Sequence, residues 1–405
     1  MNLPLFISKR ISDRKDGSFS GLISRIAVVS MSVALVALLM AFAILGGFEK
    51  NIKNKIYSFG GHLIVSKYTL STSFEESSIS IADSVMKPIV EMPGLDYYTS
   101  YIYKAGLLKA NEEVQGVIVK GVDSNFDTVS FAENMVEGSF PKFPETGYGL
   151  EIALSKKIAN YLKLSVGDDL IIFFFQNPPR MRKLKVSGIY ETGLEDFDEK
   201  TIIGDINLLR RINGWSEDVA GGVEVFMQDD SDLEAAESYL FDETSSDLYV
   251  DKVSDKYAQI FDWLRLLDRN VVIFLVLILF VACFNMVSIL LILIMERTQM
   301  IGTLSALGAD GKLLRRIFYF NGVRLIGKGL FWGNLIGLGL CWLQYQFQII
   351  PLDPANYYMD HVPILFAPKT ILLVNVMTVL LTGLTLFIPL SVISRIRPIA
   401  AIRFD

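Results

Sequence analysis

The chain has 405 residues, of which 51% are hydrophobic and 20% are charged, and its formal net charge is −6. Its mean hydropathy of +0.40 lies above that of an average soluble domain. This composition excludes a disordered chain and a purely soluble one.

Four stretches without Asp, Glu, Lys or Arg cover residues 26–48, 270–295, 329–352 and 370–394. Each exceeds the roughly 20 helical residues that cross a hydrocarbon core. The first could be a cleaved signal peptide, but it is longer than a signal core and is not followed by a small-residue cleavage site. We therefore expect a membrane anchor there and four transmembrane helices, the third extending over 317–350.

The segments in which Lys and Arg are in excess lie on one side of these predicted helices. They outnumber Asp and Glu in the segments 1–25, 296–316 and 395–405, whereas acidic residues outnumber basic ones in the long segment 49–269 and in the short loop 351–369. Basic residues mark the cytoplasmic side and are attracted to anionic lipid headgroups. We therefore expect both termini in the cytoplasm, the segment 49–269 outside, contact with membrane lipid and no nucleic-acid partner.

The chain offers little for catalytic or metal chemistry. Cys283 and Cys341 lie inside predicted helices, and His62 and His361 are remote from any cluster of ligands, so a zinc site and a Ser-His-Asp triad are poorly supported. The acidic run from Glu191 to Glu199 lacks the spacing of a calcium-binding loop, and we expect a solvated turn there.

The external segment 49–269 is long enough to bury its own core. Helical patterns predict helices at 79–90, 154–164 and 233–241, the last capped by Ser231 or Asp232. β-rich runs predict strands at 62–66, 97–103, 114–119, 170–175, 184–190 and 223–227. The predicted fold class is α+β: a four-helix transmembrane region with a large mixed α/β domain inserted between the first and second transmembrane helices.

Two features subdivide this external domain. Turn-forming residues with Pro141 and Pro144 predict a break between two subdomains within 123–145. Between two predicted strands, the run from Gln176 to Arg180 predicts a projecting hairpin tip. This tip is either a tight turn, which the sequence favours, or a docking loop.

The segment 296–316 carries an apolar stripe at helical spacing. The stripe consists of Met300, Ile301, Leu304 and Leu307, and Gly308 follows as a helix stop. Such a helix either anchors in lipid headgroups or inserts into a groove on a partner protein.

Several fragments of the chain together suggest a family. They are the run from Phe6 to Ile52, GHLIVS from Gly61, VKGVD from Val119, EIALSKKIANYLKLSVGDDL from Glu151, TGLEDFD from Thr192, ERTQMIGTLSALGADGKLLRRIF from Glu296 and RPIAAIRFD from Arg397. The fragment from Glu296 resembles the coupling-helix signature of ABC transporter permeases of the FtsX and MacB superfamily. The set as a whole resembles the LolC/LolE-type lipoprotein-releasing permeases.

This resemblance implies a bacterial inner-membrane permease whose domain 49–269 is periplasmic. It implies a second permease subunit, either another copy or a paralogue, a cytoplasmic ABC ATPase, a lipoprotein substrate and a periplasmic lipoprotein carrier. The chain has no G-x-x-x-x-G-K-[ST] sequence. We therefore expect no enzymatic activity and no cofactor on this chain, with ATP and Mg²⁺ bound by the partner ATPase.

The resemblance also indicates three sets of site residues. Coupling to the ATPase would involve Glu296, Arg297, Met300, Ile301, Leu304, Ala306, Leu307 and Gly308. Extracting acyl chains costs about 0.8 kcal/mol per CH₂ exposed to water, so the lipoprotein needs an apolar shelter. That shelter would be formed by Met40, Phe42, Leu45 and Phe48 facing Val271, Ile273, Phe274 and Leu277. The carrier would contact Gln176, Pro178, Pro179 and Arg180.

Two other functions fit the same superfamily plan. A MacB-like efflux permease is one, although such proteins carry an ATPase at their own N-terminus and here about 25 residues precede the first predicted helix. An FtsX-like regulator that transmits ATPase motion to a cell-wall hydrolase is the other. The GHLIVS and TGLEDFD fragments favour lipoprotein release.

Overall fold

The computed structural model of the chain describes residues 4–7, 19–68, 77–110, 112–229, 232–245, 247–353, 357 and 359–393. Part of the predicted N-terminal segment 1–25 and all of the predicted tail 395–405 lie outside the described residues. The chain divides into two compact units. The helical unit comprises Met1–Lys50, Leu264–Pro351 and His361–Asp405, and the sheet unit comprises Asn51–Trp263 and Leu352–Asp360.

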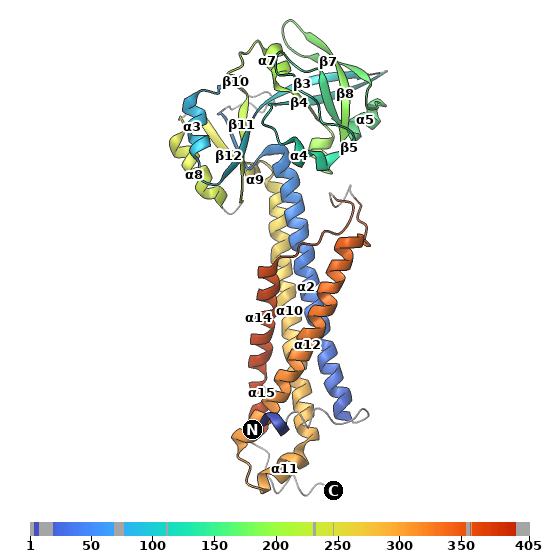
Figure 1. Cartoon of the computed structure of the whole chain (residues 1–405), viewed down its shortest axis with the longest axis vertical. Helices are drawn as coiled ribbons and strands as arrows, with labels where there is room; N and C mark the ends of the chain where they lie inside the picture. The colour runs from blue at the N-terminus through green and yellow to red at the C-terminus, as the bar shows by residue number, and fades with distance from the viewer. Residues whose placement is uncertain are drawn as a thin grey trace. The chain divides into compact units, whose positions relative to one another are not determined.

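Helices make up most of the helical unit (Figure 1). They are α2 (Phe19–Gly60), α10 (Ala258–Glu296), α12 (Gly311–Phe347), α14 (Pro368–Thr385) and α15 (Phe387–Ile393), with the short α11 (Thr298–Ala306) between α10 and α12. Four described segments are long and apolar enough to cross a membrane: Gly21–Gly60, Ala258–Glu296, Gly311–Phe347 and Pro368–Val392. Each overlaps one of the four predicted helices.

Helix α2 continues beyond the predicted end at Phe48, and its last residues belong to the sheet unit. No proline interrupts the sequence between Glu49 and Phe59. The helix ends where Gly61 takes a left-handed backbone conformation, with φ of +72°, and its N–H donates to the Tyr57 carbonyl at 2.8 Å. Charged residues therefore end the apolar stretch without ending the helix.

Helices α2 and α12 pack through small residues. Gly329, Gly333 and Gly337 recur every four residues along α12, and a Cβ added at Gly329 would lie 2.5 Å from the Met31 side chain. The Ser32 hydroxyl donates to the Gly329 carbonyl at 3.0 Å. This spacing of small residues lets two apolar helices approach closely without a polar driving force.

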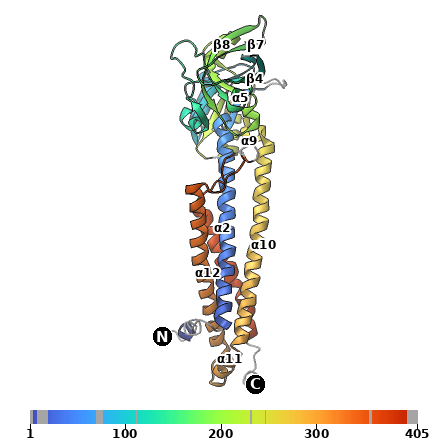
Figure 2. The ribbon, with the colours of Figure 1, turned by 90° about the vertical axis from the view of Figure 1, so that its right-hand side faces the viewer.

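A reciprocal amide pair joins α12 to α14. Asn334 donates to the side-chain oxygen of Asn375 at 2.7 Å, and Asn375 donates back at 3.0 Å. Near the α11 end of the helical unit (Figure 2), α2, α10, α12 and α15 share an apolar core that includes Leu290, Phe318 and Leu390. Close packing and the hydrogen-bonded Asn334–Asn375 pair thus both hold the described helices of this unit together.

The sheet unit contains a ten-stranded mixed sheet. Along its main path the order is β12 (Leu248–Lys252), β1 (Leu63–Lys67), β11 (Gly222–Met227), β3 (Leu95–Ala110), β4 (Glu113–Val122), β9 (Thr201–Asp205), β6 (Glu151–Ser155), β8 (Arg180–Tyr190) and β5 (Met135–Gly138). Strand β7 (Asp169–Phe174) pairs with both β3 and β8. The strands β3, β4, β9, β6, β8 and β7 consequently close into a ring.

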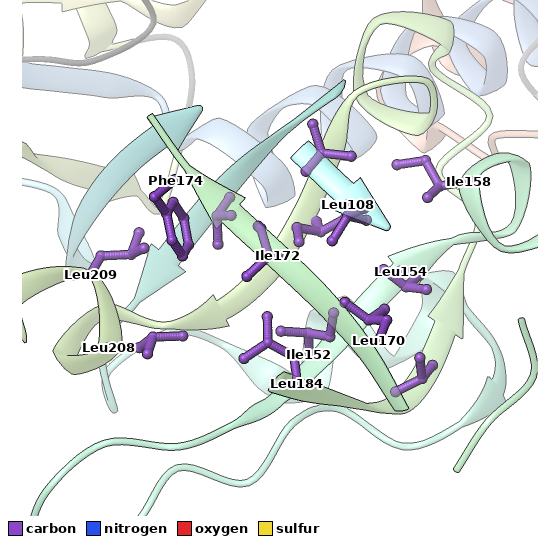
Figure 3. Close-up of a cluster of buried hydrophobic side chains, with 14 of the residues drawn as sticks. Leu108, Ile152, Leu154, Ile158, Leu170, Ile172, Phe174, Leu184, Leu208 and Leu209 are labelled. Carbon is purple, nitrogen blue, oxygen red and sulfur yellow. The ribbon is translucent and has the colours of Figure 1, made fainter. Parts of the chain in front are cut away.

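Short helices and one further strand pair complete the unit. They are α3 (Asp83–Glu91), α4 (Thr128–Phe131), the 3₁₀ turn Ala132–Asn134, α5 (Lys156–Leu162), α6 (Glu195–Asp198), α7 (Ile206–Asn213), α8 (Leu233–Glu243), α9 (Val253–Lys256) and the pair β2 (Ile79–Ser80) and β10 (Val219–Ala220). Alternate residues of β7, namely Leu170, Ile172 and Phe174, are buried with Ile152 of β6 and Leu209 of α7 in one apolar cluster (Figure 3).

The predicted mixed α/β class is confirmed, and β1, β3, β4, β7, β8 and β11 overlap the predicted strands. The predicted helix 154–164 begins too early, because the Ser155 side chain accepts the Ile158 N–H at 3.1 Å and starts α5 after β6 has ended. The predicted helix 79–90 likewise begins with β2. The segment 123–145, within which the sequence predicts a subdomain break, contains α4, the 3₁₀ turn and β5, and β5 belongs to the same sheet as β4.

Candidate functional site

Helix α11 is a short helix that follows α10 after Arg297. It ends before Gly308, whose φ is +91°, and the N–H groups of Gly308 and Ala309 donate to the carbonyls of Ser305 and Leu304 at 3.0 Å each. The glycine stop is as predicted. The predicted coupling segment 296–316 is too long, because its last residues already belong to α12.

The apolar stripe of α11 mainly faces the chain's own helices. Ile301 is 1% exposed, and Met300 and Leu304 are partly buried against the same core. Leu307, by contrast, is 80% exposed. Ile301 is therefore a core residue of this chain, and its own side chain offers no apolar surface to a partner. The predicted coupling residues that are exposed are Glu296, Ala306, Leu307 and Gly308, and Arg297 is half-buried.

The residues of the predicted shelter for acyl chains differ in exposure: some are exposed, and the others are half-buried. Ile273, Phe274 and Leu277 of α10 are 58%, 61% and 53% exposed. Phe42 of α2 and Leu275 of α10 both pack against a core that includes Leu39. Met40, Leu45, Phe48 and Val271 are half-buried. Within one chain, therefore, the exposed α10 residues do not close a pocket with α2.

An apolar groove lies farther along α10, at residues 275–287. It has a volume of about 660 Å³ and lies between α10 and the α14 and α15 helices. Its walls include Phe280, Phe284, Met377, Leu381 and Ile388. None of the predicted shelter residues lines this groove.

The ends of α2 and α10 that belong to the sheet unit meet around one aromatic residue. The ring of Phe197, in α6, lies 4.1 Å from that of Phe59 in the last turn of α2 and 5.2 Å from that of Tyr257, just before α10. Tyr57 and Phe261 also approach, with ring centroids 5.7 Å apart. We call Phe59, Phe197 and Tyr257 the aromatic joint.

The TGLEDFD fragment positions Phe197 through a buried carboxylate. Asp198 accepts the N–H and hydroxyl of Thr192 at 3.1 and 2.8 Å and the N–H of Gly193 at 2.9 Å. Burial raises the pKa of Asp198. The expectation of a solvated turn is therefore wrong for Asp198, which is 7% exposed. Its role is to satisfy the backbone of the turn that carries Phe197.

A buried ion pair lies beside the aromatic joint. The Lys120 ammonium of β4 contacts both carboxylate oxygens of Glu224 of β11 at 2.8 Å, and it donates to the carbonyl of Phe59. The Lys120 side chain is 1% exposed and that of Glu224 is 0% exposed. Burial raises the pKa of Glu224, and the Lys120 ammonium opposes that effect.

The predicted hairpin tip connects β7 to β8, which are antiparallel partners. The Gln176 side chain donates to the Ile212 carbonyl at 3.2 Å, and the Arg180 guanidinium donates to the Arg211 carbonyl at 2.9 Å. Both acceptors lie in α7. Pro178 and Pro179 are exposed at the turn. The tip is thus a short loop tied to α7 at its two ends.

Two family models match the chain. Residues 24–240 match the MacB-like periplasmic core domain, and residues 272–398 match the FtsX-like permease C-terminal family. The chain belongs to the FtsX and MacB superfamily of permeases. The first match covers more than half of the chain, and the two matches follow each other along it.

Known relatives of this permease are similar over nearly their whole length. The lipoprotein-releasing system transmembrane protein LolC of Xylella fastidiosa is 23% identical over 97% of this chain and 96% of its own length. LolE of Haemophilus influenzae is 23% identical over 98% of both chains. The periplasmic region of MacB from Actinobacillus actinomycetemcomitans covers 50% of this chain and 92% of its own, with 12% identity and a TM-score of 0.36. The predicted LolC/LolE-type permease is confirmed.

Sequence reasoning missed several residues of this permease. The repeat of Gly329, Gly333 and Gly337 is a readable signal for close helix packing. Lys120 in the apolar VKGVD run signals a buried charge that needs a partner, but the sequence does not identify Glu224 as that partner. The roles of the three predicted site sets stay predictions.

Proposed function

We propose that this permease is the transmembrane subunit of an ABC transporter that extracts lipoproteins from the bacterial inner membrane and passes them to a periplasmic carrier. The observation that carries this proposal is the near full-length similarity to proteins named LolC and LolE of the lipoprotein-releasing system. The four long apolar helices and the mixed domain between the first two of them support it.

A separate ATPase would drive the transport. The chain lacks a phosphate-binding G-x-x-x-x-G-K-[ST] sequence, so ATP and Mg²⁺ would be bound by the partner. The basic residues around α11 support a cytoplasmic position for this helix and for both termini. We assign ATPase docking to the exposed residues in and beside α11, namely Glu296, Ala306, Leu307 and Gly308, together with the half-buried Arg297.

The cargo would meet α10 on its exposed apolar side. Ile273, Phe274 and Leu277 offer side chains that are more than half exposed, and a second permease subunit would supply the facing wall. The hairpin tip from Gln176 to Arg180 would contact the carrier. Its ties to α7 support a preformed loop, which reduces the ordering cost of docking.

Depletion of the chain in cells tests this function. We expect outer-membrane lipoproteins to accumulate in the inner membrane. In parallel, proteoliposomes containing the chain, its ATPase and its permease partner should release a lipoprotein to added carrier only with ATP. Normal lipoprotein sorting combined with cell filamentation would contradict release and support an FtsX-like regulator. Export of a small molecule without lipoprotein release would support a MacB-like efflux permease.

A further inference from the structure

Lys120 connects three elements of the sheet unit at a single buried atom. Its ammonium contacts the carbonyl of Phe59 in the last turn of α2 and both carboxylate oxygens of Glu224. It also lies 4.8 Å from the ring centroid of Phe59 and 5.7 Å from that of Phe126. Lys120 pairs with Tyr103 across β4 and β3, and Glu224 pairs with Thr99 across β11 and β3. The ion pair therefore bridges the strands on both sides of β3.

The chemistry of a helix end explains why a lysine is suited to this place. The last carbonyls of a helix have no partner within the helix, and they carry partial negative charge. A cation at this end satisfies Phe59 and is attracted by the dipole of α2. The flexible stem of lysine lets a strand residue reach the helix end, and Glu224 compensates the buried charge.

Stability alone does not account for the pair. Replacing both members of a buried ion pair with apolar residues is often neutral or stabilising, because the desolvation penalty disappears together with the attraction. What such a replacement removes here is the directional bond between the sheet and the end of α2. Aromatic packing around Phe59 would remain, but it does not fix the helix end along its axis as a hydrogen bond does.

We propose that Lys120 is a positioning residue that fastens the end of α2 to β4 and β11, so that movement of α2 is delivered to the periplasmic sheet. This inference rests on the proposed function, since it identifies the residue through which ATP-driven motion reaches the domain that hands over cargo. Helix α2 is continuous from Phe19 to Gly60, so the fastened end belongs to the same helix as the first apolar span.

The test removes the fastening without leaving a buried charge. The double variant Lys120→Met with Glu224→Leu is assembled with the ATPase and the second permease, and lipoprotein released per ATP hydrolysed is measured. We expect a loss of about tenfold, within the range usual for coupling between sites, with the ATPase rate and the thermal unfolding midpoint unchanged. Release per ATP equal to that of the parent would overturn the proposal.

The matched control is another lysine–glutamate pair in the same unit. Lys252 and Glu237 lie 2.8 Å apart and are 21% and 31% exposed, and among the described residues neither forms a hydrogen bond or an ion pair with α2. The double variant Lys252→Met with Glu237→Leu should release cargo like the parent. An equal loss in both double variants would show a general effect of losing an ion pair and would overturn the specific role of Lys120.

A measurement on the unmodified complex covers the case in which the double variant does not fold. Hydrogen exchange is followed with and without ATP in the last turn of α2 and in β4 and β11. Protection should change in all three together. A change confined to α2, or no change in α2, would overturn the proposal. If the parent releases no lipoprotein while the three elements still respond together, the proposed function fails and the role of Lys120 stands.

Discussion

The ring of Phe197 lies 4.1 Å from the ring of Phe59, at an interplanar angle of 50°. Phe59 belongs to the last turn of α2, and Phe197 also reaches Tyr257 just ahead of α10. Phe197, in the TGLEDFD fragment, thereby joins the C-terminal end of α2 to the N-terminal end of α10. A displacement that separates these helix ends must break aromatic packing that contributes about 0.5–1.5 kcal/mol per pair beyond area burial.

Removing the Phe197 ring should destabilise the sheet unit strongly. Phe197 is 4% exposed, and deleting a buried phenylalanine side chain typically costs about 3–5 kcal/mol. We expect Phe197→Ala to lower the unfolding midpoint of the purified chain in detergent. Phe241, which is 65% exposed, provides the control Phe241→Ala. Equal midpoints for the two variants would contradict the joint.

Charged substitutions at Leu307 and at Ile301 should have different effects, the first on ATPase docking and the second on folding. Leu307→Asp changes an exposed side chain, so the chain should fold and yet lose the ATPase in a detergent pull-down. Ile301→Asp places a charge in the core of the helical unit, and we expect it to unfold or to be degraded. Full ATPase recovery with a folded Leu307→Asp chain would exclude this residue from docking.

A charge on the exposed side of α10 should block cargo and spare assembly. Phe274 and Phe331 are 61% and 63% exposed but lie on different helices, α10 and α12. Phe274→Glu should reduce ATP-dependent lipoprotein release, whereas Phe331→Glu should release normally. Each variant places a carboxylate in the membrane at a similar cost in free energy. The assay is release from proteoliposomes, and identical rates for the two variants would remove Phe274 from the cargo path.

Asp198 gives the stability a predictable pH dependence. Because burial raises its folded-state pKa above the ordinary value of 3.8, its contribution is fully present below the unfolded pKa and is lost as the pH rises through the folded pKa. Relative to Asp198→Asn, the parent should therefore become less stable as the pH rises from about 4, with a slope of at most about 1.4 kcal/mol per pH unit. Urea unfolding at several pH values measures this difference, and a rise with pH would refute it.

The amide pair of α12 and α14 should behave as one unit. Asn334→Leu leaves Asn375 without its interhelical partner. One unsatisfied polar group between membrane helices lowers the stability more than the removal of both polar groups does. We expect the single variant to lower the unfolding midpoint by the equivalent of about 1–2 kcal/mol. The double variant Asn334→Leu with Asn375→Leu should recover most of that loss. Additive effects would argue against pairing.

Local patterns were sufficient for much of this fold. The apolar stretches predict the four long helices, Gly308 predicts the end of α11, and the proline pair predicts the turn between β7 and β8. These features depend on neighbouring residues only. The charged extension of α2 to Gly60 was missed because hydropathy indicates where a membrane would end and says nothing about where a helix does.

Long-range pairing could not be predicted in the same way. β7 closes the ring by pairing with β3, a contact that no local pattern encodes. Lys120 and Glu224 are 104 positions apart in the sequence. Ile301 and Leu307 belong to the same apolar stripe by their helical spacing, yet Ile301 is buried and Leu307 is exposed. Which residue of an apolar stripe is buried depends on the helices packed around it, and those are set by the tertiary fold.

The closed ring also bears on how this protein can change over evolutionary time. Beside the turn, residues 171–174 of β7 pair with residues 180–183 of β8 on one side and with β3 on the other, so altering the turn leaves these hydrogen-bonded ladders in place. Insertions and deletions at that turn should be accepted without refolding of the sheet. The carrier contact proposed for the tip can therefore diverge among homologues while the strands on either side of it stay the same.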